Sequence, residues 1–561
     1  MKKGKSKKPT SPVPPKKQGT KQVVGKPLLT ESLVKYITYG CLTIILLLVI
    51  LVRYRLLGFP LERDEGEYAL MGQLILKGIP PYEMAYNMKL PGTYYVYALI
   101  MSIFGQTTIG IHLGLMLVNM STIILMFFLG KKLVNTNVGL LAAASYAILS
   151  LSPGVVGFVA HATHFIVLFS LAGLLALLKY QEKQSLYYLA LSGFCFGLSF
   201  IMKQQAIFFM VFGPIAYWII EKKRLPFNLK NSLFRFLLFG GALVLPYLIV
   251  LMSAWLTGTF DKFWHWTFEY AQQYVTVKNN NDPLINLKDE FPYVSEGFRM
   301  FWVMGLLGLV FLFFSKGTRA HRWIILLFTI TCIACVVPGL YFRSHYFITS
   351  LPALALLVAI AFNFLQEQLS KLNMAWLGVL PFLFFGYIFY HGISKHQDAF
   401  FKDDLGYLSF KSYGPANPFR ESVEVAKFVA ANSTKDDKIA VLGSEPQICF
   451  YSDRLPATGY IYTYALMENQ PYSKNMQMDM ISEIERNKPK IFIYVNSPVS
   501  WLVKQNSTKD IFDWYRQYME NYNLVGMIEL NPTGEATYTW RDALAGYEYK
   551  SNSQIWIYER K

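Results

Sequence analysis

The sequence has little charge and little cysteine for its length. Charged residues make up 16% of its 561 residues, whereas an ordinary soluble domain carries about 25%. The five cysteines form no spaced framework, which excludes a disulfide-stapled scaffold. Cys332 and Cys335 form a lone CxxC inside an apolar run, and without a second ligand pair they are typical of buried helix packing rather than of a zinc or redox site.

Apolar residues take the place of the missing charge. Hydrophobic residues make up 53% of the chain and aromatic residues 16%, and the mean hydropathy is +0.29. Apolar runs close to the ~20 residues needed to cross a bilayer recur from residue 36 to residue 391. The fold class predicted is therefore a polytopic α-helical membrane protein.

The net charge of +17 is concentrated at the N-terminus, where residues 1–35 contain ten lysines and one glutamate. This Lys- and Pro-rich segment predicts a disordered tail. A polybasic segment ahead of a membrane helix is typical of the cytoplasmic side and of contact with anionic membrane lipids, which we favour over a nucleic-acid partner. The apolar run 36–52 predicts a signal anchor, since no small-residue cleavage site follows it.

Basic loops predict the topology of the apolar segments. The segment 92–104 is short for a span and begins with tyrosines, which suit the headgroup region. If it lies in the outer interface, every basic loop faces the cytoplasm. These loops are 130–133, 178–183, 220–225, 315–322 and the loop carrying Lys371. We therefore predict about eleven spans, with the N-terminus inside and the C-terminus outside.

Two large regions follow the basic tail. Residues 36–394 form the predicted membrane domain. Residues 395–561 predict an extracytoplasmic α/β domain, in which helix patterns alternate with strands predicted at 436–443, 489–496, 523–530 and 553–561. The turn at 443–447 in this domain is not a GxGxxG, so nucleotide binding is disfavoured. Four loops of the membrane domain are predicted to converge on the outer face: 57–90, 157–164, 257–296 and 341–345.

The first outer loop carries four carboxylates between residues 62 and 67. Asp64 is the predicted N-cap of a helix that runs to about Lys77, where acidic residues suit the helix dipole. Capping does not explain four carboxylates at a membrane surface, because desolvating them is costly. A carboxylate there can instead take a proton from a hydroxyl or hold a divalent cation, while nearby cations stabilise a phosphate leaving group.

The sequence from Arg63 to Gly105 resembles the first outer loop of GT-C membrane glycosyltransferases. It is most similar to the protein O-mannosyltransferases and to the aminoarabinose transferase that modifies lipid A. Their Asp-Glu-x-x-Tyr pattern matches residues 64–68, and their Lys-Pro-Pro-like motif matches residues 89–91. The resemblance continues through residues 130–148 and 343–357 and covers most of the membrane domain.

The resemblance implies transfer of a sugar from a polyprenyl-phosphate donor such as undecaprenyl-phosphate, with inversion at the anomeric carbon. It implies a place in the cytoplasmic (inner) membrane and a glycan, lipid or protein hydroxyl as acceptor on the outer side. Asp64 would be the catalytic carboxylate and Glu65 its neighbour. The residues implied in donor-phosphate binding are Lys89, Lys203, Arg343 and His345.

The second outer loop departs from the family pattern, because His161 and His164 stand where relatives often carry an acidic residue. Histidines three apart share a helix face, and with Asp64 they could ligate a divalent metal ion of unknown identity. Hydrogen-bonded interfacial histidines are the alternative, and Lys203 could equally snorkel at a helix end. The aromatic loop 257–296 is either an interfacial anchor or an acceptor platform.

A transporter or a flippase for lipid-linked sugars is the alternative function. Such proteins are commonly built from internal repeats with charges near the bilayer midplane. Here the sequence shows no internal repeat, and its charges gather at one predicted face. The sequence therefore favours the enzyme.

Overall fold

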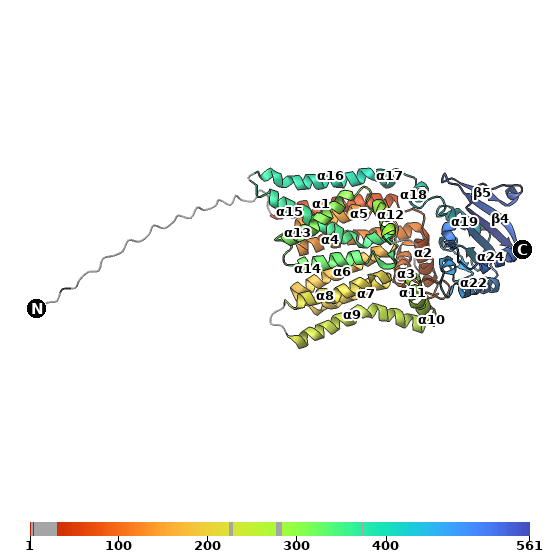
Figure 1. The fold of residues 1–561 in the computed structure, drawn as a ribbon, viewed down its shortest axis with the longest axis horizontal. Helices are drawn as coiled ribbons and strands as arrows, with labels where there is room; N and C mark the ends of the chain where they lie inside the picture. Colours follow the sequence, from red (N-terminus) through yellow and green to blue (C-terminus); the bar gives the residue numbers. More distant parts are fainter. Residues whose placement is uncertain (2–3, 5–30, 224–227, 277–282, 373) are drawn as a thin grey trace.

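The computed structural model describes residues 1, 4, 31–223, 228–276, 283–372 and 374–561. Most of the predicted basic tail, and residues 277–282 of the predicted outer loop 257–296, lie outside the described residues. The chain forms a helical bundle with a sheet domain packed against one end (Figure 1). The two parts meet around the N-terminus of a short helix, α2 (Arg63–Leu76).

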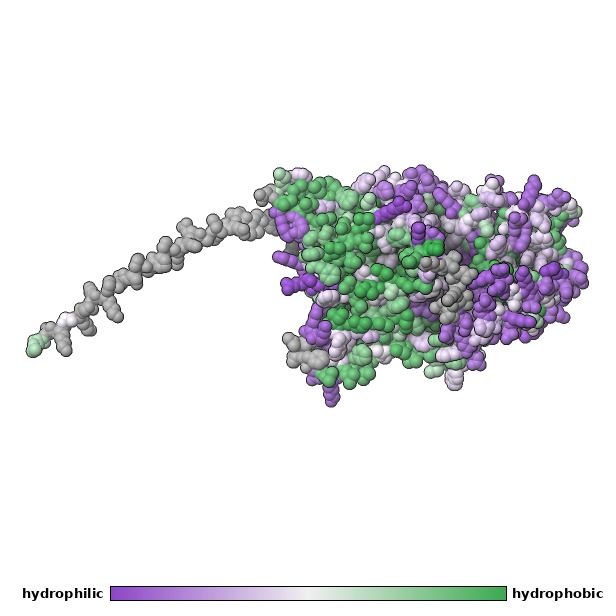
Figure 2. Space-filling model, in the orientation of Figure 1, coloured by the Kyte–Doolittle hydropathy of each residue, from purple (hydrophilic) through white to green (hydrophobic). Residues whose placement is uncertain are grey.

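The bundle consists of apolar helices that run side by side (Figure 1). They are α1 (Glu31–Arg55), α4 (Thr108–Leu133), α5 (Thr136–Leu149), α6 (Ala162–Lys183), α7 (Leu186–Met202), α8 (Ile207–Glu221), α9 (Leu229–Leu256), α13 (Arg299–Phe314), α14 (Arg322–Ala334), α15 (Leu351–Leu369) and α16 (Leu380–Lys395). On the face shown in Figure 2, hydrophobic residues form a broad patch over the bundle, while hydrophilic residues gather over the C-terminal domain. Helices satisfy every backbone polar group internally, as a hydrocarbon environment requires.

The apolar helices confirm a polytopic helical membrane protein with a C-terminal sheet domain. Six of the described helices are long and apolar enough to cross a membrane, and α12 (Pro283–Val294) with α13, bent by 112°, makes a seventh candidate. Shorter apolar helices, among them α3 (Gly92–Phe104), complete the bundle and its end. The count of about eleven spans and the N-in orientation stay predictions.

Helix α2 starts two residues earlier than expected. Its N-cap is Glu62, whose side chain accepts a hydrogen bond from the Glu65 N–H at 2.9 Å, so the prediction of Asp64 as N-cap is wrong. The extended backbone of Glu62 lets its longer side chain reach back over the first turn. Asp64 is thereby left free to face away from the cap.

The C-terminal domain is built on one mixed sheet of six strands. The strands are β1 (Lys438–Leu442), β2 (Leu455–Pro456), β3 (Ile491–Asn496), β4 (Tyr522–Leu530), β5 (Ala536–Trp540) and β6 (Gln554–Arg560), in the order β2-β1-β3-β6-β4-β5. β1 pairs in parallel with β2 and β3, and the other pairings are antiparallel. Helices α19 (Glu421–Ala431), α20 (Gln447–Ser452), α21 (Tyr464–Met467), α22 (Ser473–Asn487) and α24 (Asp510–Tyr518) complete the domain. The predicted strands β1, β3, β4 and β6 are confirmed, whereas β2 and β5 were not predicted.

The turn at 443–447 fixes the C-terminal domain to α2. The Arg63 guanidinium forms a buried ion pair with Glu445 at 2.6 Å and donates to the Ser444 carbonyl at 3.0 Å. A Cβ on Gly66 would lie 2.7 Å from the Cβ of Gln447, so only glycine permits this close approach. The turn therefore serves as a docking surface for the helix that carries Asp64.

Candidate active site

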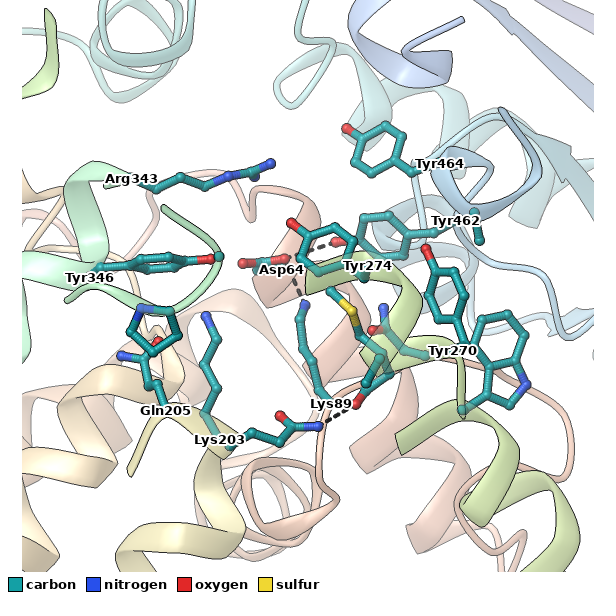
Figure 3. Close-up of a pocket in the computed structure, with 18 of the residues that line it drawn as sticks. Asp64, Lys89, Lys203, Gln205, Tyr270, Tyr274, Arg343, Tyr346, Tyr462 and Tyr464 are labelled. Carbon is teal, nitrogen blue, oxygen red and sulfur yellow. Dashed lines mark hydrogen bonds and ion pairs between the residues drawn. The ribbon is translucent and has the colours of Figure 1, made fainter. Parts of the chain in front are cut away.

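A cavity with an empty volume of about 1120 Å³, counting the space at its open mouth, lies where the bundle meets the C-terminal domain (Figure 3). Ring-bearing side chains from both parts of the chain form much of its wall, including Trp266, Tyr270, Tyr274, Tyr346 and Tyr464. Its charged and titratable residues are Asp64, Lys89, Lys203, Arg343 and His345. The structure thus brings together residues from three of the predicted outer loops, the end of α7 and the C-terminal domain.

Asp64 is held from two directions. Its Oδ1 accepts a hydrogen bond from Lys89 Nζ at 2.7 Å and another from the Tyr462 hydroxyl at 3.1 Å. Burial alone would raise the pKa of Asp64, but the positive charges of Lys89 and Lys203 outweigh it and hold the pKa well below its usual value. Asp64 is therefore an ionised carboxylate with a fixed orientation.

Lys89 is placed to hold carboxylates. Its ammonium contacts Asp64 and also donates to Glu67 Oε2 at 2.5 Å, while Glu67 Oε1 accepts from the Tyr94 hydroxyl at 2.6 Å. Burial would lower the pKa of Lys89, but the two carboxylates raise it above its usual value. With two anionic partners already bound, Lys89 is better suited to fixing Asp64 than to binding a phosphate alone.

Lys203 and Arg343 are the cations available to an anionic ligand. Among the described residues neither forms an ion pair with a carboxylate, and both point towards the space beside Asp64 (Figure 3). Lys203 Nζ lies 4.5 Å from the centre of the Tyr346 ring, a cation–π contact. Burial lowers the pKa of Lys203 to about 8, although Asp64 opposes the shift. A bound phosphate would be the anionic partner that neither side chain has.

A second cavity, with an empty volume of about 930 Å³ counted in the same way, reaches Asp64 from another side. It shares with the larger cavity the residues Asp64, Arg343, His345, Tyr462 and Tyr464. The rest of its wall is more polar and includes Glu62, His161, Glu290, Tyr293, Ser344, Ser412 and Tyr413. Two ligands can therefore approach the same carboxylate through different cavities.

Asp64, His161 and His345 form a group that fits a divalent cation. One ligand atom from each lies within 4.8 Å of the others, and the two imidazole rings stack with centroids 4.0 Å apart. His161 Nδ1 and His345 Nε2 are buried, and neither has a hydrogen-bond partner among the described residues. Burial lowers the pKa of His161 to about 3 and that of His345 well below its usual value, so both are neutral, the form that binds metals.

Two sequence-predicted site residues lie outside both cavities. His164 is absent from the cation-fitting group, because His161 is the extended N-cap of α6 and the two histidines do not share a helical face. Glu65 is fully buried and its Oε1 binds His112 Nε2 at 3.0 Å and the Ala160 N–H at 2.6 Å. Successive helix residues point about 100° apart, so Glu65 ties α2 to α4 and the α6 loop while Asp64 faces the cavities.

The C-terminal domain supplies wall residues that sequence reasoning missed. Tyr462 and Tyr464 belong to the segment YIYTY, residues 460–464, and line both cavities. Alternating tyrosines in an otherwise polar loop were the available signal. Nothing in their spacing pointed to Asp64, which is 398 residues from Tyr462 in sequence.

A sequence model of the dolichyl-phosphate-mannose-protein mannosyltransferase family matches residues 88–253. None of the curated proteins compared with the sequence matches it.

Two solved structures share the fold over most of the chain. ArnT from Cupriavidus metallidurans bound to undecaprenyl phosphate is 12% identical, with a TM-score of 0.57 over 92% of this chain and 98% of that chain. The oligosaccharyltransferase AglB from Archaeoglobus fulgidus, in complex with an inhibitory peptide and a dolichol-phosphate, is 11% identical, with a TM-score of 0.52 over 91% of this chain and 75% of that chain. The predicted resemblance to GT-C membrane glycosyltransferases is thereby confirmed, in the fold and in the matched segment.

Proposed function

We propose that this protein is a glycosyltransferase that moves a sugar from a polyprenyl-phosphate donor, such as undecaprenyl-phosphate sugar, to an acceptor hydroxyl. The observation that carries the proposal is the site itself: the fixed carboxylate of Asp64 faces Lys203 and Arg343, two cations that form no ion pair within the described ranges. Similar proteins bound to undecaprenyl phosphate and to dolichol-phosphate support a lipid-linked donor.

The larger cavity suits the donor and the smaller one the acceptor. Aromatic and apolar side chains line much of the larger cavity, where an isoprenoid phosphate finds both a nonpolar wall and two cations. The smaller cavity is lined by hydroxyls, carboxyls and imidazoles that match a polar acceptor. The acceptor is a glycan, lipid headgroup or protein hydroxyl.

The reaction is a single displacement at the anomeric carbon. The acceptor oxygen attacks that carbon from the smaller cavity, and its proton passes to Asp64 Oδ2. The bond from the anomeric carbon to the phosphate oxygen breaks, and its electron pair leaves on the phosphate, where Lys203 and Arg343 stabilise the added charge. Attack opposite the leaving group inverts the anomeric configuration.

A divalent cation is the alternative to proton transfer at Asp64 Oδ2. Asp64, His161 and His345 would hold it, and it would supply Lewis-acid stabilisation of negative charge at the acceptor oxygen. The neutral imidazole of His345 can also donate an N–H to the donor phosphate, which is the role expected from the sequence. Asp64 keeps its orientation through Lys89 and Tyr462 in either case.

The proposed location of the active site is the extracytoplasmic side of the cytoplasmic membrane. About eleven spans in the cytoplasmic membrane, with the N-terminus inside, put both cavities and the C-terminal domain on the extracytoplasmic side. Asp64 precedes α3 and lies 4.0 Å from His161, which follows α5. This proximity supports a non-spanning α3, because α4 and α5 alone return the chain to the same side.

The proposal is tested by sugar transfer from purified undecaprenyl-phosphate sugars to membrane-envelope acceptors, with products identified by mass spectrometry. Asp64→Asn is expected to lower kcat by at least about 100-fold. The matched control is Asp510→Asn, which also removes a carboxylate from a helix first turn, but on the exposed surface of α24. Size-exclusion profiles check folding, and full transfer by Asp64→Asn contradicts the assignment.

A further inference from the structure

Tyr462 connects the C-terminal domain directly to Asp64. It lies in the loop between β2 and α21, and its hydroxyl is 3.1 Å from Asp64 Oδ1. Its ring also lies over Lys89, with the ammonium 5.5 Å from the ring centre. A residue from the sheet domain thus touches both members of the central ion pair in the membrane domain (Figure 3).

The two oxygens of Asp64 have different surroundings. Oδ1 receives the hydrogen bonds of Lys89 and Tyr462. Oδ2 lies 4.0 Å from His161 Nδ1 and 3.9 Å from His345 Nε2, beyond hydrogen-bond distance of both. One oxygen is therefore an anchor, and the other faces the gap between the histidines.

Lys89 alone would not fix the plane of this carboxylate. An ammonium is a compact point charge on a flexible stem, and Lys89 is shared between Asp64 and Glu67. A second donor at Oδ1 restricts rotation about the bond from Cβ to Cγ. Orientation within a fraction of an ångström is what converts a nearby base into an effective one.

The loop that carries Tyr462 is itself held firmly. The Thr463 N–H donates to Ser444 Oγ at 3.0 Å, and the Thr463 hydroxyl donates to the Ser500 carbonyl at 2.8 Å. The Tyr464 hydroxyl donates to the Val499 carbonyl at 2.9 Å. Ser444 belongs to the same turn that accepts Arg63 of α2. Tyr462 is therefore fixed relative to the helix that bears Asp64.

We propose that Tyr462 is a positioning residue: its hydroxyl holds Asp64 Oδ1, so that Oδ2 faces the reacting atoms. The C-terminal domain is then a part of the catalytic unit. This inference rests on the proposed function, since its readout is the transfer reaction.

The test compares Tyr462→Phe with wild type, using undecaprenyl-phosphate sugar as donor. Phenylalanine keeps the ring over Lys89 and removes only the hydroxyl. Loss of a hydrogen bond to a charged group predicts a kcat lower by about 10–100-fold. The donor KM is expected to change less than about 2-fold, because the phosphate contacts are untouched.

The matched control is Tyr547→Phe, which removes a tyrosine hydroxyl that donates to the Glu529 carboxylate at 2.8 Å in the same domain, away from the cavities. It is expected to keep wild-type kcat. Thr463→Val leaves Tyr462 intact but loosens its loop, and is expected to lower kcat by a smaller factor than Tyr462→Phe. Unfolding midpoints in detergent are compared for all variants, so that a loss of folded protein is separated from a loss of turnover.

The outcomes separate this inference from the proposed function. If the wild-type protein transfers no sugar, the proposed function fails. If the wild type is active and Asp64→Asn is not, but Tyr462→Phe retains wild-type kcat or raises only KM, Tyr462 is not a positioning residue. An equal loss of kcat in Tyr547→Phe overturns the inference in the same way.

Discussion

The two cavities that meet at Asp64 differ in the chemistry of their walls. The larger one joins aromatic side chains to Lys203, and the smaller one gathers Glu62, His161 and hydroxyl-bearing residues such as Tyr413. Only the wall between them is common, and it contains Asp64 and Arg343. A reaction between two ligands of unlike polarity requires such a division, because each cavity can then select its own ligand.

The strongest test of this division is Arg343→Ala, because Arg343 belongs to the shared wall. Loss of its guanidinium removes charge stabilisation from the leaving phosphate, and kcat is expected to fall by about 100- to 1000-fold. The measurement is single-turnover sugar transfer. Arg516→Ala, which removes an exposed arginine from α24, is the control, and comparable losses in both variants would refute a specific role.

Lys203 lines only the larger cavity and tests the donor side. Lys203→Ala is expected to weaken the binding of undecaprenyl phosphate by about 10–100-fold. In the wild type this binding should also weaken as the pH rises through about 8, the lowered pKa of Lys203, because the neutral amine no longer attracts the phosphate.

Lys203→Arg separates the loss of the cationic side chain from the loss of its charge at high pH, because a guanidinium stays charged between about pH 7 and pH 9. Its binding of undecaprenyl phosphate should not vary between about pH 7 and pH 9. A pH dependence that persists in Lys203→Arg would assign the titration to another group.

Tyr413 lines only the smaller cavity and tests the acceptor side. Its hydroxyl is buried and has no hydrogen-bond partner in the part of the chain that the structure describes, so a polar acceptor is expected to bind it. Tyr413→Phe should lower kcat/KM for the acceptor by about 3–10-fold, and undecaprenyl phosphate affinity should stay the same. An equal loss of both would show that the cavities are not functionally separate.

The smallest expected effect concerns Glu62, which lines the smaller cavity. Burial, with Asp64 and Glu65 nearby, raises the pKa of Glu62 from 4.5 to about 8. Between these values the folded protein binds a proton that the unfolded chain releases, so this contribution to stability is complete below about pH 4.5 and is lost as the pH rises towards 8.

Glu62→Gln should therefore flatten the fall in unfolding temperature between about pH 5 and pH 8. Glutamine keeps an oxygen to accept the Glu65 N–H, so the helix cap is preserved. The measurement is thermal unfolding in detergent with EDTA present. An unchanged pH dependence in the variant would exclude Glu62 as its source.

Sequence patterns were sufficient to single out the residues that the membrane domain contributes to the candidate site. Asp64, Lys89, Lys203, Arg343 and His345 stood out because a charged or titratable residue beside an apolar run is costly to bury and therefore noticeable. The basic loops predicted the topology, and that topology placed these five residues on the same face of the membrane. Four strands were predictable because each contains a short apolar run. The other two lack this signal, since β2 has only two residues and β5 exposes part of its length.

The directions in which the side chains of the acidic motif point were not predictable from the sequence. Asp64 and Glu65 are adjacent in one acidic motif, yet one faces the cavities and the other is a buried clamp. The difference depends on the helix starting after Glu62, and helix boundaries are uncertain by one or two residues. Tyr462 was missed because contacts between distant segments leave no local pattern.

The ion pair between Arg63 and Glu445 has a consequence for synthesis of the chain. Its partners are 382 residues apart, so the ribosome completes the whole bundle before Arg63 meets its carboxylate. Lys89 reaches Asp64 after only 25 residues. The site is therefore complete only after the C-terminal domain has been synthesised and Tyr462 has reached Asp64.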